Sequence, residues 1–373
     1  MQPFPMYRSI IKYDWGFEVM QKERISSIQM FLLLSGFLFG SSVILAPTSG
    51  AKNDAWLAII IGGVGGLFLM WVYASIAFLN PSKSLIDILQ EKFGKIIGNI
   101  IGLMYVWYFI HLASLVFRDF GEFICTVTYP DTPMVVVIGV FAIVLVYAVN
   151  SGIEVLGRVS EVLMIIVPIV ITIISISLVT IHDFTAFLPV LENGMTPVLG
   201  AAFSFIAFPY GETVAFLMLF QHINKREKLS KIVIVSAILS ILVGIFIFFR
   251  DISVLGGDLM ARSTFISHIA TMFIPGINVE PLVDLNLSIG GEIKIAICIY
   301  AAVKALSQIA GIDDYKKLTL AVSTFCVVLS IWEYNNIIEL FNWADKVWPF
   351  YSIPFQIAIP LLLLLLSLRK RKA

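Results

Sequence analysis

The stretches FLFGSSVILAP, residues 37–47, and FSFIAFPYGETVAF, residues 203–216, interrupt two long apolar runs near their middles. Each interruption lies about 13 residues, or roughly 20 Å of helix, from one end of its run. The residues at the breaks are Gly40, Ser41 and Ser42 in the first run, and Pro209, Tyr210, Gly211 and Glu212 in the second. Proline removes a backbone donor and glycine favours unwinding, so we expect both helices to open there. A proline kink and a glycine packing contact are the simpler alternative.

The composition around these stretches is that of a membrane protein. Hydrophobic residues make up 59% of the 373 residues, charged residues make up 13%, and the mean hydropathy is +0.95. Soluble domains carry roughly twice that share of charge. The formal net charge is zero, so no basic face is available for nucleic acid. Because the sequence also lacks a phosphate loop, a nucleophile triad and metal-like cysteine spacing, we expect no enzyme, cofactor or metal.

Ten segments are long and apolar enough to cross a bilayer, which requires roughly 20 residues. In chain order, these spans one to ten are 27–49, 55–79, 96–127, 134–150, 159–181, 196–221, 231–254, 285–309, 317–338 and 347–368. Segment 82–95 is amphipathic and is expected at the membrane interface. The sequence thus predicts an all-α integral membrane protein in contact with the lipid bilayer, with an N-terminal segment 1–26, a transmembrane domain 27–368 and a basic tail 369–373.

The lysines and arginines predict the orientation of the spans, because basic residues concentrate in cytoplasmic loops. With the N-terminus placed inside, the predicted cytoplasmic segments carry eighteen lysines and arginines and the predicted outer segments carry four. The bias alternates correctly at every loop. We therefore expect ten spans with both termini in the cytoplasm.

The two breaks fall in corresponding helices if the spans form two five-helix halves, 27–181 and 196–368. Paired interruptions in such halves indicate a transporter-like binding site, because free backbone groups at membrane depth are tolerated where they line a cavity. The N–H groups that open the second half of span one suit a carboxylate. The carbonyl groups that close the first half of span six suit an ammonium group or hydroxyls. This pairing fits a small zwitterion such as an amino acid.

Five stretches carry a resemblance to a known family. They are ERISSIQMFLLLSGFLFGSSVILAP at 23–47, LVFRDFGEFICTVTYPDTP at 115–133, GIEVLGRVSEVLMIIVP at 152–168, FPYGETVAFLMLF at 208–220 and KIAICIYAAVKALSQIAGIDDYKKL at 294–318. Together they resemble the B subunit of spore germinant receptors, in the amino acid–polyamine–organocation transporter superfamily. The sequence departs at Ser42, where superfamily members often have a second glycine.

The resemblance implies a leucine-transporter-like fold of ten helices in two inverted repeats, with helices 1 and 6 broken. It also implies germinant sensing at the inner membrane of the spore, beside a larger A subunit and a C lipoprotein subunit. Two functions stay open. The chain is either a receptor subunit that binds a small germinant, an amino acid above all, or a proton-coupled amino acid transporter.

The expected ligand site combines the two breaks with side chains of spans three and eight, which the resemblance places against the breaks. Its residues are Gly40, Ser41, Ser42, Val43, Tyr108, Leu112, Phe208, Pro209, Tyr210, Gly211, Glu212, Ala296 and Tyr300. A carboxylate at mid-membrane is costly and usually functional. Glu212 is therefore expected to bind a ligand ammonium, to carry a proton or to cap the second half of span six. The aromatic residues have packing as their alternative role.

Four further groups of charges have two interpretations each. Lys294 either replaces the ion that sodium-coupled relatives hold near span eight or snorkels outward along its helix. His111 either carries a proton or is hydrogen-bonded inside the bundle. Arg118 and Glu122 are spaced for an i,i+4 ion pair at one mouth of the bundle. Glu154, Arg158 and Glu161 repeat this arrangement at the other mouth, and both clusters are expected to be structural or gating clamps.

Overall fold

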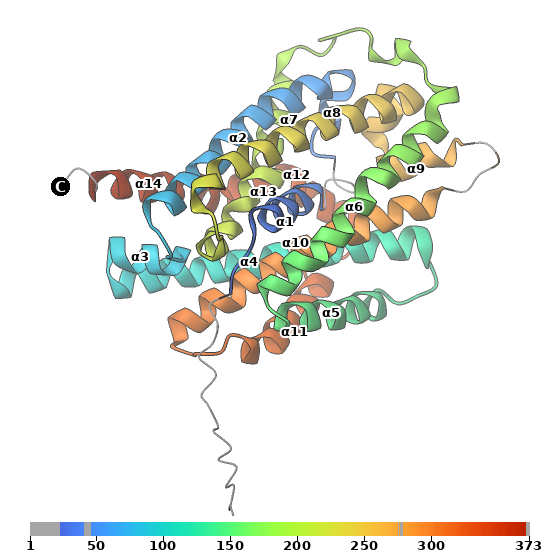
Figure 1. Ribbon diagram of the computed structural model, residues 1–373. Helices are drawn as coiled ribbons and strands as arrows, with labels where there is room; N and C mark the ends of the chain where they lie inside the picture. Colours follow the sequence, from blue (N-terminus) through green and yellow to red (C-terminus); the bar gives the residue numbers. More distant parts are fainter. Residues whose placement is uncertain (1–22, 41–45, 275, 277–278, 371–373) are drawn as a thin grey trace, which may run out of the picture.

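The computed structural model describes residues 23–40, 46–274, 276 and 279–370, and in this part of the chain helices are the regular elements (Figure 1). The α-helices are α1 (Ser27–Phe39), α2 (Ala55–Leu79), α3 (Leu85–Phe93), α4 (Lys95–Phe123), α5 (Met134–Asn150), α6 (Ile153–Leu178), α7 (Met195–Phe205), α8 (Leu229–Arg262), α9 (Ile266–Met272), α10 (Glu280–Ala310), α11 (Lys316–Trp332), α12 (Ile337–Lys346), α13 (Trp348–Tyr351) and α14 (Ile359–Lys370). Shorter 3-10 and π turns extend several of them. The all-helical architecture confirms the predicted fold class.

Each of the ten predicted spans corresponds to helical structure. Seven described segments are long and apolar enough to cross a membrane, and the bent pair α11–α12 makes an eighth. The two other spans contain the shorter apolar helices α1 and α5. Large apolar side chains such as Val64, Ile143 and Trp332 are more than half exposed on the outside of the bundle. An outer surface of this kind requires lipid, so the chain is a multi-pass membrane protein.

Helix α10 forms the centre of the bundle and packs against α4, α1 and α6 (Figure 1). Residues 293–303 of α10 are all buried, whereas the helices at the periphery bury one face only. Ser26 is the N-cap of helix α1: its hydroxyl accepts from the backbone N–H of Gln29 at 3.2 Å, and the Gln29 side chain accepts from the Ser26 N–H at 2.9 Å. This reciprocal cap directs the chain into the bundle beside α10.

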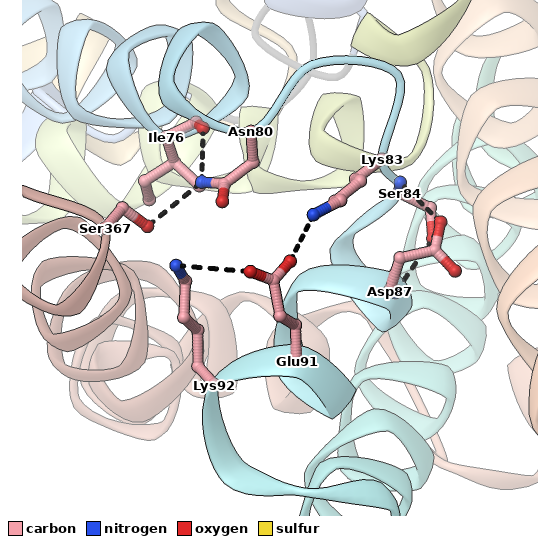
Figure 2. A network of polar contacts seen from close by, with 8 residues as sticks. All are labelled: Ile76, Asn80, Lys83, Ser84, Asp87, Glu91, Lys92 and Ser367. Carbon is pink, nitrogen blue, oxygen red and sulfur yellow. Dashed lines mark hydrogen bonds and ion pairs between the residues drawn. The ribbon is translucent and has the colours of Figure 1, made fainter. Parts of the chain in front are cut away.

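Polar side chains gather where the end of α2 lies near α3 and α14, as Figure 2 shows. Asn80, which ends α2, donates from Nδ2 to the Ser367 hydroxyl of α14 at 3.0 Å. Ser84 caps α3 through Asp87, and Glu91 of the same helix receives two cations, Lys83 and Lys92. The amphipathic segment 82–95 is therefore a short helix, as predicted, and the Ser84 hydroxyl ties its start to α10 by donating to Gln308 Oε1 at 2.8 Å.

Several boundaries differ from the prediction by a turn or more, and at two of them the chain also changes direction. Helix α8 continues past residue 254 to Arg262, bending at Gly256, which has a φ of 72°. Predicted span nine ends at Trp332, and α12 follows at an angle of 103°. The N-cap Asn336 accepts at Oδ1 from the Glu339 N–H at 3.0 Å, so it starts a new helix rather than continuing the old one. The division into halves 27–181 and 196–368 stays a prediction.

Candidate ligand site

The predicted break in span six is confirmed. Helix α7 ends at Phe205, and Phe208 has φ −133° and ψ 118°, which is extended backbone. The chain then resumes as 3-10 turns from Gly211 to Met218. Pro209 directly follows the extended residue and lacks the N–H that an unbroken helix would need there.

Span one stops at the predicted depth. Helix α1 ends at Phe39, and Gly40 has φ −33° and ψ −96°, which is not helical. A Cβ atom on Gly40 would lie 3.0 Å from Lys294 Cδ and 3.1 Å from the carbonyl oxygen of Gly290, so glycine permits close packing against α10. Ser41, Ser42 and Val43 lie outside the described residues.

Glu212 and Lys294 form an ion pair at the centre of the bundle. Lys294 Nζ lies 2.5 Å from Glu212 Oε2, and both side chains are at most 1% exposed. The ammonium also lies 4.3 Å from the centroid of the Phe208 ring and 5.4 Å from that of Phe37. The prediction that Lys294 snorkels outward is therefore wrong, because burial of this ammonium is compensated by a carboxylate and two aromatic faces.

A cavity of about 410 Å³ extends from this ion pair toward α12. Phe208, Glu212 and Lys294 line its deep end, and Leu112, Leu115, Val116 and Asp119 of α4 line one wall. Trp343 of α12 and Trp348 of α13 line it from the other side. The cavity reaches the surface near Arg262 and Asp345, both of which are exposed. It brings together three of the expected ligand residues, Leu112, Phe208 and Glu212, with Lys294, which was expected at an ion site.

Other expected ligand residues pack inside the bundle instead. The Tyr108 ring stacks on Trp348 and Phe355, and its hydroxyl accepts from Gln356 Nε2 at 2.8 Å. Tyr210 packs on Gly66 of α2, where a Cβ atom would lie 2.2 Å from the Tyr210 ring. Three more expected residues behave similarly: Ala296 is buried in α10, Gly211 faces Gln356, and Pro209 lines a neighbouring cavity of about 120 Å³.

Tyr300 was expected to wall the ligand, but it belongs to a separate polar cluster. Its hydroxyl donates to Glu23 Oε2 at 3.0 Å and lies 3.1 Å from His222 Nε2. Tyr315 donates to the other Glu23 oxygen at 3.1 Å. The cluster therefore joins the segment before α1 to α10 and to the chain that follows span six, away from the cavity.

The two charge clusters differ from each other. Arg118 pairs with Glu122 at 2.7 Å, as predicted, and also donates to the carbonyl groups of Ser330 and Ile331 at 3.1 Å, at the end of α11. The matching pairs at Glu154, Arg158 and Glu161 are absent from the described residues. Glu154 instead accepts from the backbone N–H of Arg24 at 2.6 Å. The predicted ion pairs of this second cluster are therefore not formed, and Glu154 instead holds the segment before α1.

His111 is hydrogen-bonded inside the bundle. Its Nε2 lies 3.2 Å from Glu333 Oε1, and its ring contacts Trp107, Trp343 and Tyr351. The other oxygen of Glu333 accepts from Ser114, one turn further along α4. This placement agrees with the structural alternative for His111, whereas a role in proton transfer stays a prediction.

Sequence reasoning missed Asp119, Trp343, Trp348 and Gln356. Asp119 stands beside Arg118 and was assigned no ligand role, although it is 3% exposed and lines the cavity. The two tryptophans follow an unrecognised turn after α11. Gln356 lies in an otherwise apolar span. An amide side chain in such a span needs a hydrogen-bond partner inside the bundle, and this was the signal in the sequence.

Comparisons with known proteins agree on family and fold. The family model described as spore germination protein matches residues 24–338. Spore germination protein KB of Bacillus subtilis (strain 168) is 34% identical over 370 residues, which cover 95% of this chain and 97% of that protein. Putative spore germination protein YfkT of the same organism is 27% identical over 324 residues, 85% of this chain and 87% of that protein.

Two solved transporters share the fold. MhsT in complex with L-phenylalanine superimposes with a TM-score of 0.66 at 15% identity, covering 93% of this chain and 99% of that one. Mhp1, a nucleobase-cation-symport-1 family transporter with bromovinylhydantoin bound, gives a TM-score of 0.62 at 12% identity, covering 92% of this chain and 78% of that one. The fold is therefore leucine-transporter-like, with helix 6 visibly broken. By its match over most of its length, the chain belongs to the spore germination protein family, on the B-subunit branch that its sequence resembles.

Proposed function

We propose that this chain is the germinant-sensing membrane subunit of a spore germination receptor and that its germinant is an amino acid. The observation that carries the proposal is the cavity that ends at the broken part of span six. Its volume of about 410 Å³ lies within the roughly 300–1,000 Å³ typical of small-molecule sites. The buried Glu212–Lys294 pair at the deep end and Asp119 on the α4 wall provide polar groups beside the apolar side chains of the lining.

The class of ligand is supported by the related transporter that was solved with L-phenylalanine. An amino acid needs partners for one carboxylate and one ammonium group. The N–H groups that open the second half of span one, at Ser42, Val43 and Ile44, are the proposed partners of the carboxylate, because a helix start favours negative charge; these residues lie outside the described structure. Leu112 and Phe208 would contact the side chain of the ligand.

Sensing requires that ligand binding change the population of two states of the protein. A ligand bound between the breaks in spans one and six would stabilise one arrangement of these two spans over another. The relatives include spore germination proteins A2 and B2 of Bacillus subtilis. An A subunit and a C lipoprotein subunit at the inner membrane of the spore are therefore the proposed partners, and both termini are proposed to face the cytoplasm.

The experiment compares spores that lack this chain with spores in which it is restored. Each of the twenty amino acids is tested for germination, and binding of the same compounds to the purified full chain is measured by calorimetry. We expect at least one amino acid to act only when the chain is present and to bind the purified chain. If no amino acid does either, the proposed function is wrong.

A proton-coupled amino acid transporter is the second candidate. It is favoured by the likeness to two transporters and by a buried carboxylate beside the cavity. Purified chain in liposomes would then accumulate a labelled amino acid when a proton gradient is imposed. Binding without accumulation supports the receptor, and accumulation supports the transporter.

A further inference from the structure

Asp119 is a buried acid of the cavity whose charge the central ion pair leaves uncompensated. It is 3% exposed, lines the cavity, and its Oδ1 atom has no hydrogen-bond partner among the described residues. A buried carboxylate without a partner is costly, so its presence calls for a ligand or another compensating group.

The neighbouring cations are engaged elsewhere. Arg118 precedes Asp119 in the chain, but its guanidinium pairs with Glu122 and with carbonyl groups at the end of α11. Lys294 pairs with Glu212 at 2.5 Å. Within the described part of the chain, no lysine or arginine lies within 4.0 Å of the Asp119 carboxylate.

The charges at the deep part of the cavity therefore favour a cation. Glu212 and Lys294 neutralise each other, so Asp119 gives the deep part of the cavity one net negative charge when a bound cation keeps it ionised. Trp343 and Trp348 also line the cavity, and the faces of indole rings attract ammonium groups. One face of α4 carries Leu112, Leu115 and Asp119. A ligand whose apolar part contacts the two leucines would therefore place its cationic group near the Asp119 carboxylate.

We propose that Asp119 binds the cationic group of the ligand and makes this cavity selective for amines. This inference rests on the proposed function for its biological meaning, since an amine is what an amino acid germinant presents. The proposal assigns the ammonium group of the ligand to Asp119. Glu212 is a poor partner for that ammonium group because it is already paired with Lys294.

The charge of the cavity can be measured without knowing the germinant. Leu115 lies one turn from Asp119 on the cavity wall. In purified full chain with Cys125 replaced by serine, Leu115→Cys is treated with a cationic and with an anionic methanethiosulfonate reagent. We expect the cationic reagent to react faster, relative to a free thiol, and Asp119→Asn to lower this preference by about tenfold.

Asp131→Asn is the matched control, because it removes the same charge from an exposed position. Asp119→Glu should keep the preference. Asp119→Ser replaces Asp119→Asn if the latter is not recovered folded. The proposal is overturned if the Leu115→Cys protein shows no preference for the cationic reagent. It is also overturned if that preference survives neutral substitution of Asp119.

A ligand-sized pair of probes tests amine selectivity directly. Butylamine and butanol have the same size, and each is added before the reagent reacts with Leu115→Cys. We expect butylamine to slow the reaction and butanol not to, and this difference to vanish in Asp119→Asn. Equal protection by the two probes refutes the Asp119 site, whereas failure of all amino acids in the germination assay refutes the proposed function alone.

Discussion

At the scale of single residues, the central feature is a buried ion pair in place of two independent charges. Glu212 was expected to act on a ligand, and Lys294 was expected to replace an ion. The structure joins them at 2.5 Å with both side chains out of contact with solvent. Removing one partner of such a pair leaves an uncompensated buried charge, whereas removing both does not. The pair therefore predicts a specific pattern of single and double substitutions.

We expect Glu212→Gln to destabilise the chain by about 3–5 kcal/mol, because it strands the ammonium of Lys294. The double variant Glu212→Gln with Lys294→Met should recover most of this loss. Thermal unfolding of purified protein, followed by fluorescence, provides the measurement. Equal stability of Glu212→Gln and the parent would show that the pair does not form.

At the scale of elements, the bundle is held by polar contacts at the ends and breaks of its helices. Gln356, in a π turn (Pro354–Ala358) before α14, donates to Tyr108 of α4 and to the carbonyl of Ala207 at the span-six break. Tyr73 of α2 donates to the carbonyl groups of Gly211 and Gln356. These contacts satisfy two carbonyl groups at the span-six break, those of Ala207 and Gly211.

Gly211→Ala should therefore destabilise the chain by about 1–3 kcal/mol. The new Cβ would lie 2.0 Å from Gln356 Oε1 and would displace an amide that is held by two hydrogen bonds. Gly200→Ala in α7 is the control, because nothing lies within 4 Å of its Cβ position. That change should be neutral or slightly stabilising in the same unfolding assay. A harmless Gly211→Ala would contradict the close packing.

The two predicted clamps should respond differently to the same substitution. Arg118→Gln removes the partner of Glu122 and the donor to two carbonyl groups of α11, so we expect a loss of about 3–5 kcal/mol. Arg158→Gln changes an exposed side chain for which no ion pair exists in the described structure, and it should fall within about 0.5 kcal/mol of the parent. Comparable losses in the two variants would argue against this distinction.

At the scale of the whole molecule, contacts between loops can be compared with the sides that the charge bias predicts for them. Asn53 donates to the carbonyl of Leu188 and lines the same surface hollow as Asn193. Asn224 donates from its backbone to Ile25, before α1. Each of these contacts joins two loops that the charge bias places on the same side, and the side of the membrane that each pair faces is a prediction.

Single cysteines at positions 53 and 193 should react with impermeant thiol reagents added to intact cells. A cysteine at position 224 should react only after the membrane is opened, because its loop belongs to the basic set. Expression of each variant is checked by immunoblot. Reaction of position 224 in intact cells would reverse the orientation.

The sequence by itself was sufficient for the membrane class, the ten spans and the depth of the two breaks. These properties depend on local composition and on backbone chemistry: a run of apolar residues crosses a bilayer in any fold, and Pro209 lacks its amide hydrogen wherever it lies. The capped helix α3 was predictable for the same reason. The resemblance to known relatives added the repeat architecture, and the comparisons confirmed the family.

Only the tertiary structure decided which polar groups meet. Lys294 is as compatible with snorkelling as with burial until α1 and the span-six break pack around it. Tyr300 faces Glu23 rather than the cavity because rotation of α10 is set by contacts along its whole length. Asp119 became a candidate ligand residue once Arg118 was seen to bind α11. The physical reason is that pairing of buried charges depends on distances between elements remote in sequence, which hydrophobic periodicity does not encode.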